Sequence, residues 1–237
     1  MSMGIQGYLA MTGAEFSHIE QLCFPAWMSC HFSPWGTGLT NFPPGLPQGS
    51  MLILDDSIPP AHHDVLQIAE QLTQNCKRLQ PDCVLLDFQR PKNPKTMEIC
   101  QALVSSLPCP VGVSQLYAKD LSCPVLLECP APGISLEAVA SAFTGRELWL
   151  EIAPEGRRLV LTEKGCQVFP EALDDHKTAY YDTETASHYH WYLESGQAIF
   201  HIWRDIACLQ KLISQANDLH FTKTIGLYQQ LGPAFFQ

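Results

Sequence analysis

Four apolar runs of the chain each end in a carboxylate that is soon followed by proline. The runs read MLILDDSIPP, VLLDFQRP, VLLECPAP and LWLEIAP, and their acids are Asp55 and Asp56, Asp87, Glu128 and Glu151. An almost wholly apolar strand is typical of a parallel sheet that is buried on both faces. In α/β folds, ligand sites are built at the carboxyl ends of such strands. We therefore expect these acids to gather at one end of a parallel sheet.

Strands and helices alternate along most of the chain. Apolar runs predict strands at residues 5–11, 28–32, 51–55, 83–88, 111–116, 125–127 and 148–152. Helical spacing of apolar residues predicts helices at 14–22, 61–79, 94–107 and 135–143. The stretch between strands 111–116 and 125–127 is too short for a crossover helix. After residue 152 the pattern changes to two β-hairpins, and helices are predicted at 206–216 and 219–231.

This order of elements predicts an irregular (β/α)8 TIM-like barrel with one missing or short helix. Residues 1–237 would form a single barrel domain, with residues 156–197 as a β-hairpin insertion before the last strand. A doubly wound open sheet is the alternative. The segment after the first strand, GYLAMTGAEF, carries neither a GxGxxG motif nor a P-loop motif, and we predict no cofactor.

The composition bears on the class of partner. A net charge of −10 with only 14 Lys and Arg provides no basic surface for nucleic acid or for an anionic membrane. No apolar run approaches the length of a membrane-spanning helix, and the N-terminal segment lacks the features of a secretory signal. The ten cysteines include no CxxC pair, and we interpret them as thiols of a cytoplasmic protein.

Residues 82–89, with the sequence DCVLLDFQ, are the most informative stretch. Because side chains alternate along a strand, Asp87 and Gln89 would face the barrel interior together. The stretch resembles the fourth-strand signature D-G-x-D-x-D-x-E of the chitinase-like glycoside hydrolases of family 18. Asp82 and Asp87 fall on the first and last aspartates of that signature. Tyr117 is similar to the tyrosine that these barrels place beside the sugar.

The same stretch departs from the family at three positions. Cys83 stands where the family has glycine, Leu85 where it has its middle aspartate, and Gln89 where it has the glutamic acid that donates the proton. An amide cannot protonate a leaving group as a carboxylic acid does. The resemblance therefore implies a glycoside-hydrolase-like barrel, but hydrolysis by the family's acid is lost.

The converging acids predict a site at the rim of the barrel. Asp87 and Glu128 are the candidate catalytic residues, acting as base or stabiliser and as acid. The candidate binding residues are Asp55, Gln89, Tyr117, Trp203 and Trp35. The expected ligand is a carbohydrate or another small polar molecule. Each acid taken alone could instead cap a helix or form a rim ion pair.

Two further readings of the sequence stay open. Loss of the glutamate at position 89 would leave a non-catalytic binding or regulatory barrel. A metal-dependent hydrolase is suggested by His188-x-His190, since both imidazoles would face the same side of a strand. The pair falls in a late hairpin rather than on a first barrel strand, and alternation of aromatic residues explains it without a metal, so we predict no metal site.

Overall fold

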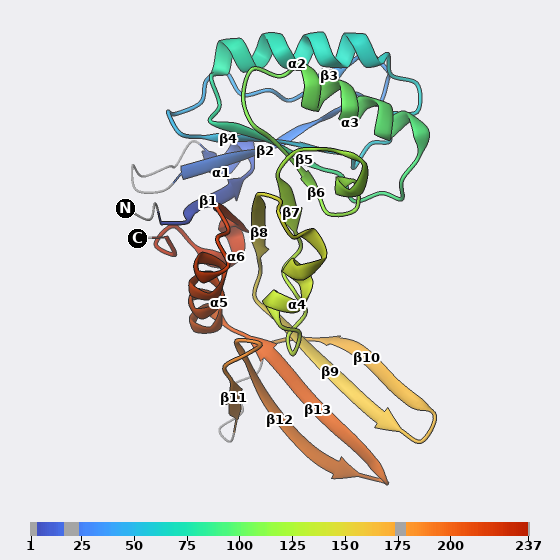
Figure 1. Ribbon diagram of the computed structural model, residues 1–237, viewed down its shortest axis with the longest axis vertical. Coiled ribbons are helices and arrows are strands. Elements are labelled where there is room, and N and C mark those ends of the chain that lie inside the picture. The colour runs from blue at the N-terminus through green and yellow to red at the C-terminus, as the bar shows by residue number, and fades with distance from the viewer. Residues whose placement is uncertain (1–3, 17–23, 174–178, 237) are drawn as a thin grey trace.

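The structure is a computed structural model, and it describes residues 4–16, 24–173 and 179–236. Within these residues, eight parallel strands form a closed barrel (Figure 1). In chain order they are β1 (Gln6–Met11), β2 (Phe24–Phe32), β4 (Met51–Asp55), β5 (Cys83–Asp87), β6 (Val111–Ser114), β7 (Val125–Leu127), β8 (Leu148–Ile152) and β14 (Lys223–Leu227). The TIM-like barrel is confirmed. An open sheet is excluded because β1 pairs with both β2 and β14.

The barrel interior is filled by alternate side chains of these strands. Tyr8, Met51 and Trp149 are fully buried in an inner cluster that is separate from the core between barrel and helices. The indole of Trp149 fits because β6 carries Gly112, at which an added Cβ would lie 2.3 Å from the ring. These side chains therefore fill the barrel interior near the amino ends of the strands, and the space that remains lies nearer their carboxyl ends.

The helices outside the barrel are uneven in length. The longer ones are α2 (Val65–Leu79), α3 (Pro94–Ser106) and α5 (Ile206–Asp218), and each begins at a capping side chain: Asp64, Asn93 and Asp205. The short ones are α1 (Gly13–Phe16), α4 (Leu136–Ala140), α6 (Tyr228–Leu231) and the 3-10 turns η1 (Ala118–Asp120) and η2 (Ser141–Phe143). Only η1 connects β6 to β7, which confirms the missing helix.

One predicted helix lies mostly outside the described residues, and another is wrong. The helix predicted at 14–22 is described only as α1, and residues 17–23 lie outside the described residues. The helix predicted at 219–231 is wrong, because residues 223–227 form β14 and only α6 follows. Thr224, Ile225 and Gly226 are buried between β8 and β1, so closing the barrel determines the conformation of this segment.

A second sheet is inserted between β8 and α5. It is antiparallel and projects from the barrel, and its described residues form five strands in the order β10-β9-β13-β12-β11 (Figure 1). Its strands are β9 (Glu155–Thr162), β10 (Gly165–Glu171), β11 (Tyr180–Asp182), β12 (Ser187–Glu194) and β13 (Gln197–Arg204). The insertion is thus larger than the hairpin expected at 156–197. The small antiparallel strand β3 (Leu39–Thr40) pairs with β2.

Arg204 fastens the inserted sheet to the barrel. It is fully buried at the end of β13, and its guanidinium donates to the carbonyl oxygens of Thr185 (2.7 Å), Ile134 (3.1 Å) and Pro130. Pro130 and Ile134 belong to the loop after β7, and Thr185 to the turn before β12. One side chain therefore joins three segments where the sheet leaves the barrel.

None of the described helices is long and apolar enough to cross a membrane. Nine of the ten cysteines lie within the described residues, and these nine are free thiols.

Candidate functional site

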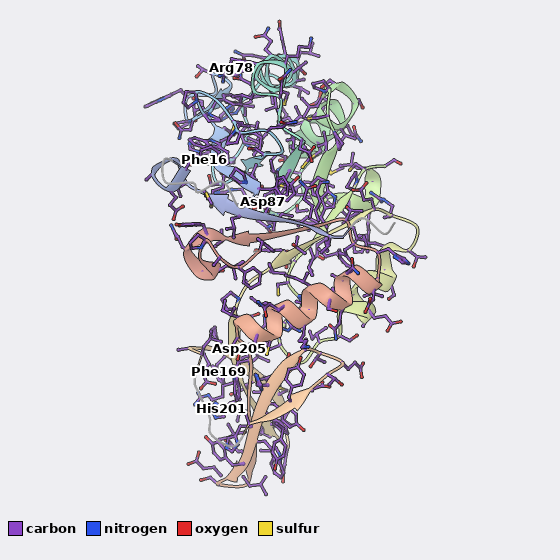
Figure 2. All side chains as sticks on the ribbon, turned by 90° about the vertical axis from the view of Figure 1, so that its left-hand side faces the viewer. Phe16, Arg78, Asp87, Phe169, His201 and Asp205 are labelled. Carbon is purple, nitrogen blue, oxygen red and sulfur yellow. The ribbon has the colours of Figure 1, made fainter. Side chains whose placement is uncertain are left out.

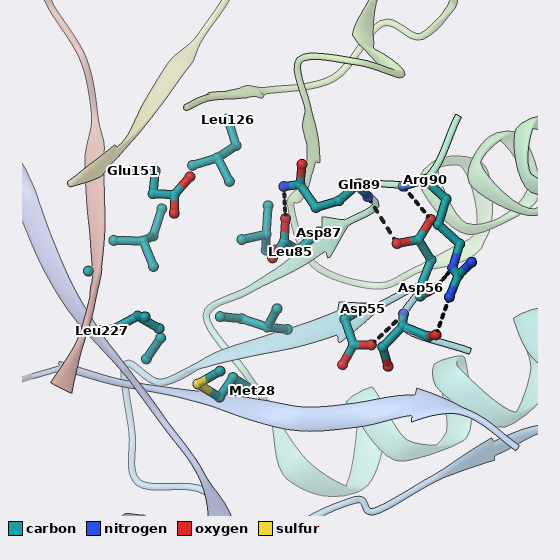
Figure 3. Close-up of a pocket in the computed structure, with 15 residues that line it drawn as sticks. Met28, Asp55, Asp56, Leu85, Asp87, Gln89, Arg90, Leu126, Glu151 and Leu227 are labelled. Carbon is teal, nitrogen blue, oxygen red and sulfur yellow. Dashed lines mark hydrogen bonds between the residues drawn. The ribbon is translucent and has the colours of Figure 1, made fainter. Parts of the chain in front are cut away.

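A cavity of about 420 Å³ opens at the carboxyl ends of the barrel strands (Figure 3). Its walls are mainly apolar and include Met28, Leu85 and Leu227. Its polar groups come from the strand ends and from the loops that follow them: Asp55, Asp56, Ser57, Asp87, Gln89, Arg90 and Glu151. Apolar walls with a few converging polar groups are typical of a small-molecule site.

Strand pairing places the acids of this cavity. Asp55 and Asp87 are direct partners in the pairing of β4 with β5, and both are the last residues of their strands. Glu151 lies on β8, separated from β5 by β6 and β7, so that it comes from a different wall. Figure 3 shows the carboxyl groups of Asp87 and Glu151 directed into the same space. Asp55, Asp56, Asp87 and Glu151, four of the five acids predicted to gather at the rim, therefore line one cavity.

Asp56 holds the two loops beside the cavity in place. It is buried, and its carboxylate accepts hydrogen bonds from the backbone N–H groups of Gln89 (2.9 Å) and Arg90 (3.1 Å). The Arg90 side chain donates in return to the carbonyl oxygens of Asp56 (2.7 Å) and Ser57 (2.6 Å). Since Arg90 is committed to backbone carbonyls, it does not pair with the cavity acids.

Asp87 accepts a hydrogen bond from Gln89, the residue at the position where family 18 has its proton donor. The Gln89 side chain donates through Nε2 to Oδ1 of Asp87 at 2.6 Å. Burial raises the pKa of Asp87, the Gln89 hydrogen bond opposes that rise, and the charges of Asp55, Asp56 and Glu128 add to it. Asp87 is thus an oriented hydrogen-bond acceptor with one oxygen already occupied.

Among the described acids, Glu151 has the most strongly shifted pKa. Burial, followed by the negative charges of Asp87 and Glu128, raises its pKa from 4.5 to about 7. Within the described part of the chain, no hydrogen bond to its carboxyl group is found. At neutral pH this group therefore exists in both protonation states, and it can donate or accept a hydrogen bond to a ligand.

Two residues predicted for the site lie elsewhere. Glu128 is exposed, follows the end of β7 and does not line the cavity. Tyr117 is fully buried on the outer side of the barrel wall, where its ring packs edge-on against Phe88. Its hydroxyl group donates to the Arg90 carbonyl oxygen at 2.8 Å. Tyr117 supports the loop after β5 rather than contacting the cavity.

The two tryptophans predicted as binding residues are also outside the cavity. Trp35 is 84% exposed in the loop between β2 and β3. Trp203 is buried on β13 of the inserted sheet, where it stacks on His188 with ring centroids 5.5 Å apart. Among the described residues, no aromatic side chain lines the cavity. The aromatic residues of the inserted sheet, such as Trp191 and Tyr192, are partly exposed on a separate surface.

Comparisons of the sequence and of the structure with known proteins give different results. The sequence matches no known family and no curated protein. The structure, in contrast, is similar to a chitinase from Chromobacterium violaceum, with 11% identity and a TM-score of 0.61, over 98% of this chain and 96% of that chain. It is also similar to a glycoside hydrolase family 18 N-acetylglucosaminidase from Paenibacillus barengoltzii, with 10% identity and a TM-score of 0.60, over 94% of each chain.

A third similar structure contains a ligand. The family 18 chitinase from Cycas revoluta in complex with allosamidin is 12% identical, with a TM-score of 0.54, over 93% of this chain and 94% of that chain. The fold of the protein is therefore that of the family 18 glycoside hydrolases, as the stretch 82–89 suggested. At these identities the likeness concerns the fold alone.

Proposed function

We propose that the protein is a carbohydrate-binding barrel that holds one N-acetylated sugar residue in the cavity at the barrel mouth and does not hydrolyse it by the family's mechanism. The hydrogen bond from Gln89 to Asp87 carries this proposal. A family 18 fold supports the class of ligand, and chitinases among the similar structures are described with sugar-type ligands. The amide at position 89 supports binding without proton donation.

The cavity has chemistry suited to a neutral polar ligand. Asp55 and Asp87 offer acceptor oxygens for hydroxyl or amide N–H groups, and protonated Glu151 offers a donor. The apolar wall formed by Met28, Leu85 and Leu227 suits an acetyl group or the face of a sugar ring. Because these polar groups lie on several strands of a closed barrel, they are preorganised, which lowers the entropic cost of binding.

Calorimetric titration with N-acetylglucosamine oligomers tests the proposal. We expect the wild type to bind, and Asp87→Ala and Glu151→Ala, which remove the hydrogen-bonding groups altogether, each to weaken the affinity about tenfold, the cost of one hydrogen bond to a charged or strongly polar group. Glu128→Ala is the matched control, because Glu128 is an exposed acid outside the cavity. An affinity that is unchanged in both cavity variants would refute this site.

Hydrolysis through a different acid is the second candidate function. The specific observation is the pKa of about 7 for Glu151, a value suited to a general acid, beside Asp87 as base or stabiliser. A chromogenic N-acetylglucosaminide separates the two candidates. If the wild type releases the chromophore and Glu151→Gln lowers kcat at least about a hundredfold, hydrolysis is supported.

Gln89→Glu provides a further comparison in the same assay. It restores a carboxyl group at the family's proton-donor position without changing the length of the side chain. For a binding barrel that has lost only its acid, we expect activity in Gln89→Glu and none in the wild type. Equal activity in both proteins would contradict the proposal that position 89 decides between binding and hydrolysis.

A further inference from the structure

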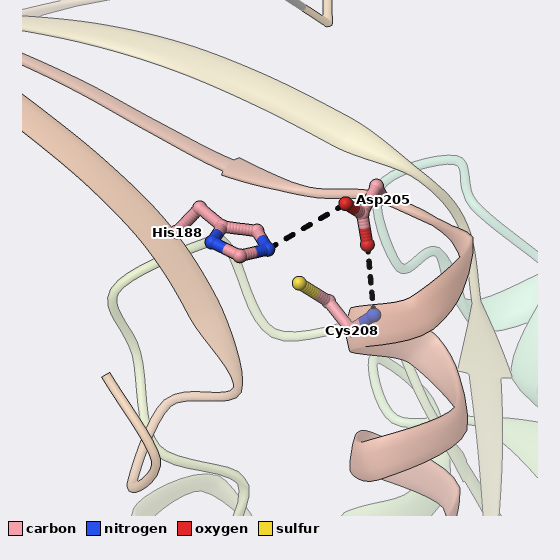
Figure 4. Close-up of side chains that lie close together, drawn as sticks. All are labelled: His188, Asp205 and Cys208. Atoms are coloured by element: carbon pink, nitrogen blue, oxygen red, sulfur yellow. Dashed lines mark hydrogen bonds and ion pairs between the residues drawn. The ribbon is translucent and has the colours of Figure 1, made fainter. Parts of the chain in front are cut away.

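Three side chains of different chemistry meet where the inserted sheet joins the barrel. They are His188 on β12, Asp205 directly before α5, and Cys208 in the first turn of α5 (Figure 4). One imidazole nitrogen, one carboxylate oxygen and the thiol sulfur all lie within 4.8 Å of one another. Figure 2 shows Asp205 at the junction between α5 and the second sheet, away from Asp87 in the barrel.

The distance between His188 and Asp205 fits a shared metal ion better than a direct hydrogen bond. Nε2 of His188 lies 3.5 Å from Oδ2 of Asp205, at the long limit for an N–H···O contact. Zinc bonds of about 2.0–2.2 Å to nitrogen and oxygen place two tetrahedral ligands about 3.4 Å apart, and a nitrogen and a sulfur ligand about 3.6 Å apart. Since the three ligand atoms already lie within 4.8 Å of one another, the separations to sulfur would have to shorten by at most about 1.2 Å to complete such a set.

Each of the three groups is held in position by the fold. Oδ1 of Asp205 accepts the Cys208 backbone N–H at 2.9 Å as the cap of α5, which leaves Oδ2 directed toward His188. The imidazole of His188 is stacked on Trp203 and packed against Tyr181, with ring centroids 5.5 and 5.1 Å apart. Cys208 is 1% exposed on α5. The ligand set is therefore preorganised by two separate elements.

The exposure of the cluster argues against a nucleophilic role for the thiol. A nucleophilic cysteine must be accessible to its substrate, whereas Cys208 is buried. The imidazole of His188 and the carboxyl group of Asp205 are partly exposed, so that an ion can enter and keep a water molecule as a further ligand. A thiolate and a carboxylate together neutralise a divalent ion, which would displace the proton of the buried Cys208 thiol.

We propose that His188, Asp205 and Cys208 form a binding site for a zinc-class divalent cation. Three protein ligands of the N, O and S types with one open position are a known zinc arrangement, and the thiolate disfavours magnesium and calcium. His188 belongs to the inserted sheet, whereas Asp205 caps α5 of the barrel and Cys208 lies in its first turn. The ion would therefore crosslink the two parts and fix the direction in which the sheet projects.

The test is metal binding by the whole chain. The protein is stripped with a chelator, dialysed and titrated with zinc, and bound metal is measured by elemental analysis. We expect one zinc per chain and a higher midpoint of thermal unfolding. With cobalt in place of zinc, we expect a thiolate-to-metal charge-transfer band and the visible absorption of a tetrahedral site.

Variants identify the ligands. Cys208→Ser removes the charge-transfer band, and His188→Ala lowers zinc affinity more than about tenfold. Asp205→Asn retains the cap of α5, because an amide oxygen also accepts a backbone N–H, yet it weakens zinc binding. Cys166→Ser and His190→Ala are the matched controls, each removing the same residue type outside the cluster.

Two results would overturn the proposal. One is a wild-type chain that takes up no stoichiometric zinc at micromolar free metal. The other is zinc binding that is equally strong in the wild type, His188→Ala and Asp205→Asn, each shown to be folded by circular dichroism. Neither result bears on sugar binding in the barrel cavity, which is measured separately.

Discussion

Replacing Glu151 by glutamine is expected to stabilise the protein at alkaline pH. The pKa of Glu151 is raised from 4.5 to about 7, chiefly by burial. Between these two values, the folded protein keeps a proton that the unfolded chain has lost. The free energy of unfolding therefore falls as the pH rises through this range. A pKa difference of this size corresponds to at most about 3 kcal/mol. Partial solvent access at the cavity mouth lowers the expected value to about 2 kcal/mol.

Glutamine has nearly the same shape as glutamate and carries no charge at any pH. The difference in unfolding free energy between Glu151→Gln and wild type should therefore grow by about 2 kcal/mol between pH 5 and pH 8. Urea denaturation of both proteins at the two pH values measures it. The raised pKa of Asp87 affects both proteins and largely cancels in the comparison. Glu128→Gln, which alters an exposed acid, should show a change below about 0.5 kcal/mol.

Two observations would refute this reasoning. If the difference between Glu151→Gln and wild type is the same at both pH values, the carboxyl group of Glu151 is not desolvated in the folded protein. If Glu151→Gln becomes less stable than wild type as the pH rises, the ionised carboxylate has a favourable partner in the fold. In either case, Glu151 would lose its assignment as the group that is partly protonated at neutral pH.

Three further predictions concern stability and are checked by chemical denaturation. Gly112→Ala would force a methyl group against the buried ring of Trp149 and cost about 1–3 kcal/mol, whereas Gly45→Ala, with nothing within 4 Å, should change little. Asp64→Ala removes the cap of α2 and should cost about 1 kcal/mol; an unchanged midpoint would contradict the capping role. Arg204→Met should cost more than about 3 kcal/mol, because buried carbonyl oxygens lose their donors; a smaller loss would mean that water replaces the guanidinium.

The barrel could be predicted because most of its strands are nearly continuous apolar runs. A strand covered on both faces needs such a run, and residues 51–55, 83–87 and 148–152 each supply one. β14 was missed because KTIGL is short and begins with lysine, so that its environment between β8 and β1, rather than its own composition, makes it a strand. The size of the inserted sheet was underestimated because pairing between distant strands is not encoded locally.

The position of the cavity was predicted more accurately than the residues that line it. Asp55, Asp87 and Gln89 were placed correctly relative to one another, because strand pairing and alternation determine their positions. The sequence alone does not distinguish Glu128 from Glu151, since both end apolar runs. The structural difference is that β7 ends at Leu127, before Glu128, whereas Glu151 is still within β8. Two residues before it, Trp149 points into the barrel interior, and Glu151 therefore faces the same way.

Arg204 anchors only one end of the inserted sheet, the root beside the barrel, and the hairpin turns lie at the opposite end. The root is joined to the barrel by buried hydrogen bonds, whereas the hairpin turns at 163–164 and 195–196 lie at exposed positions beyond it. Insertions at such turns leave the root contacts unchanged. Longer loops could therefore be inserted at these turns while the barrel and its cavity remain intact.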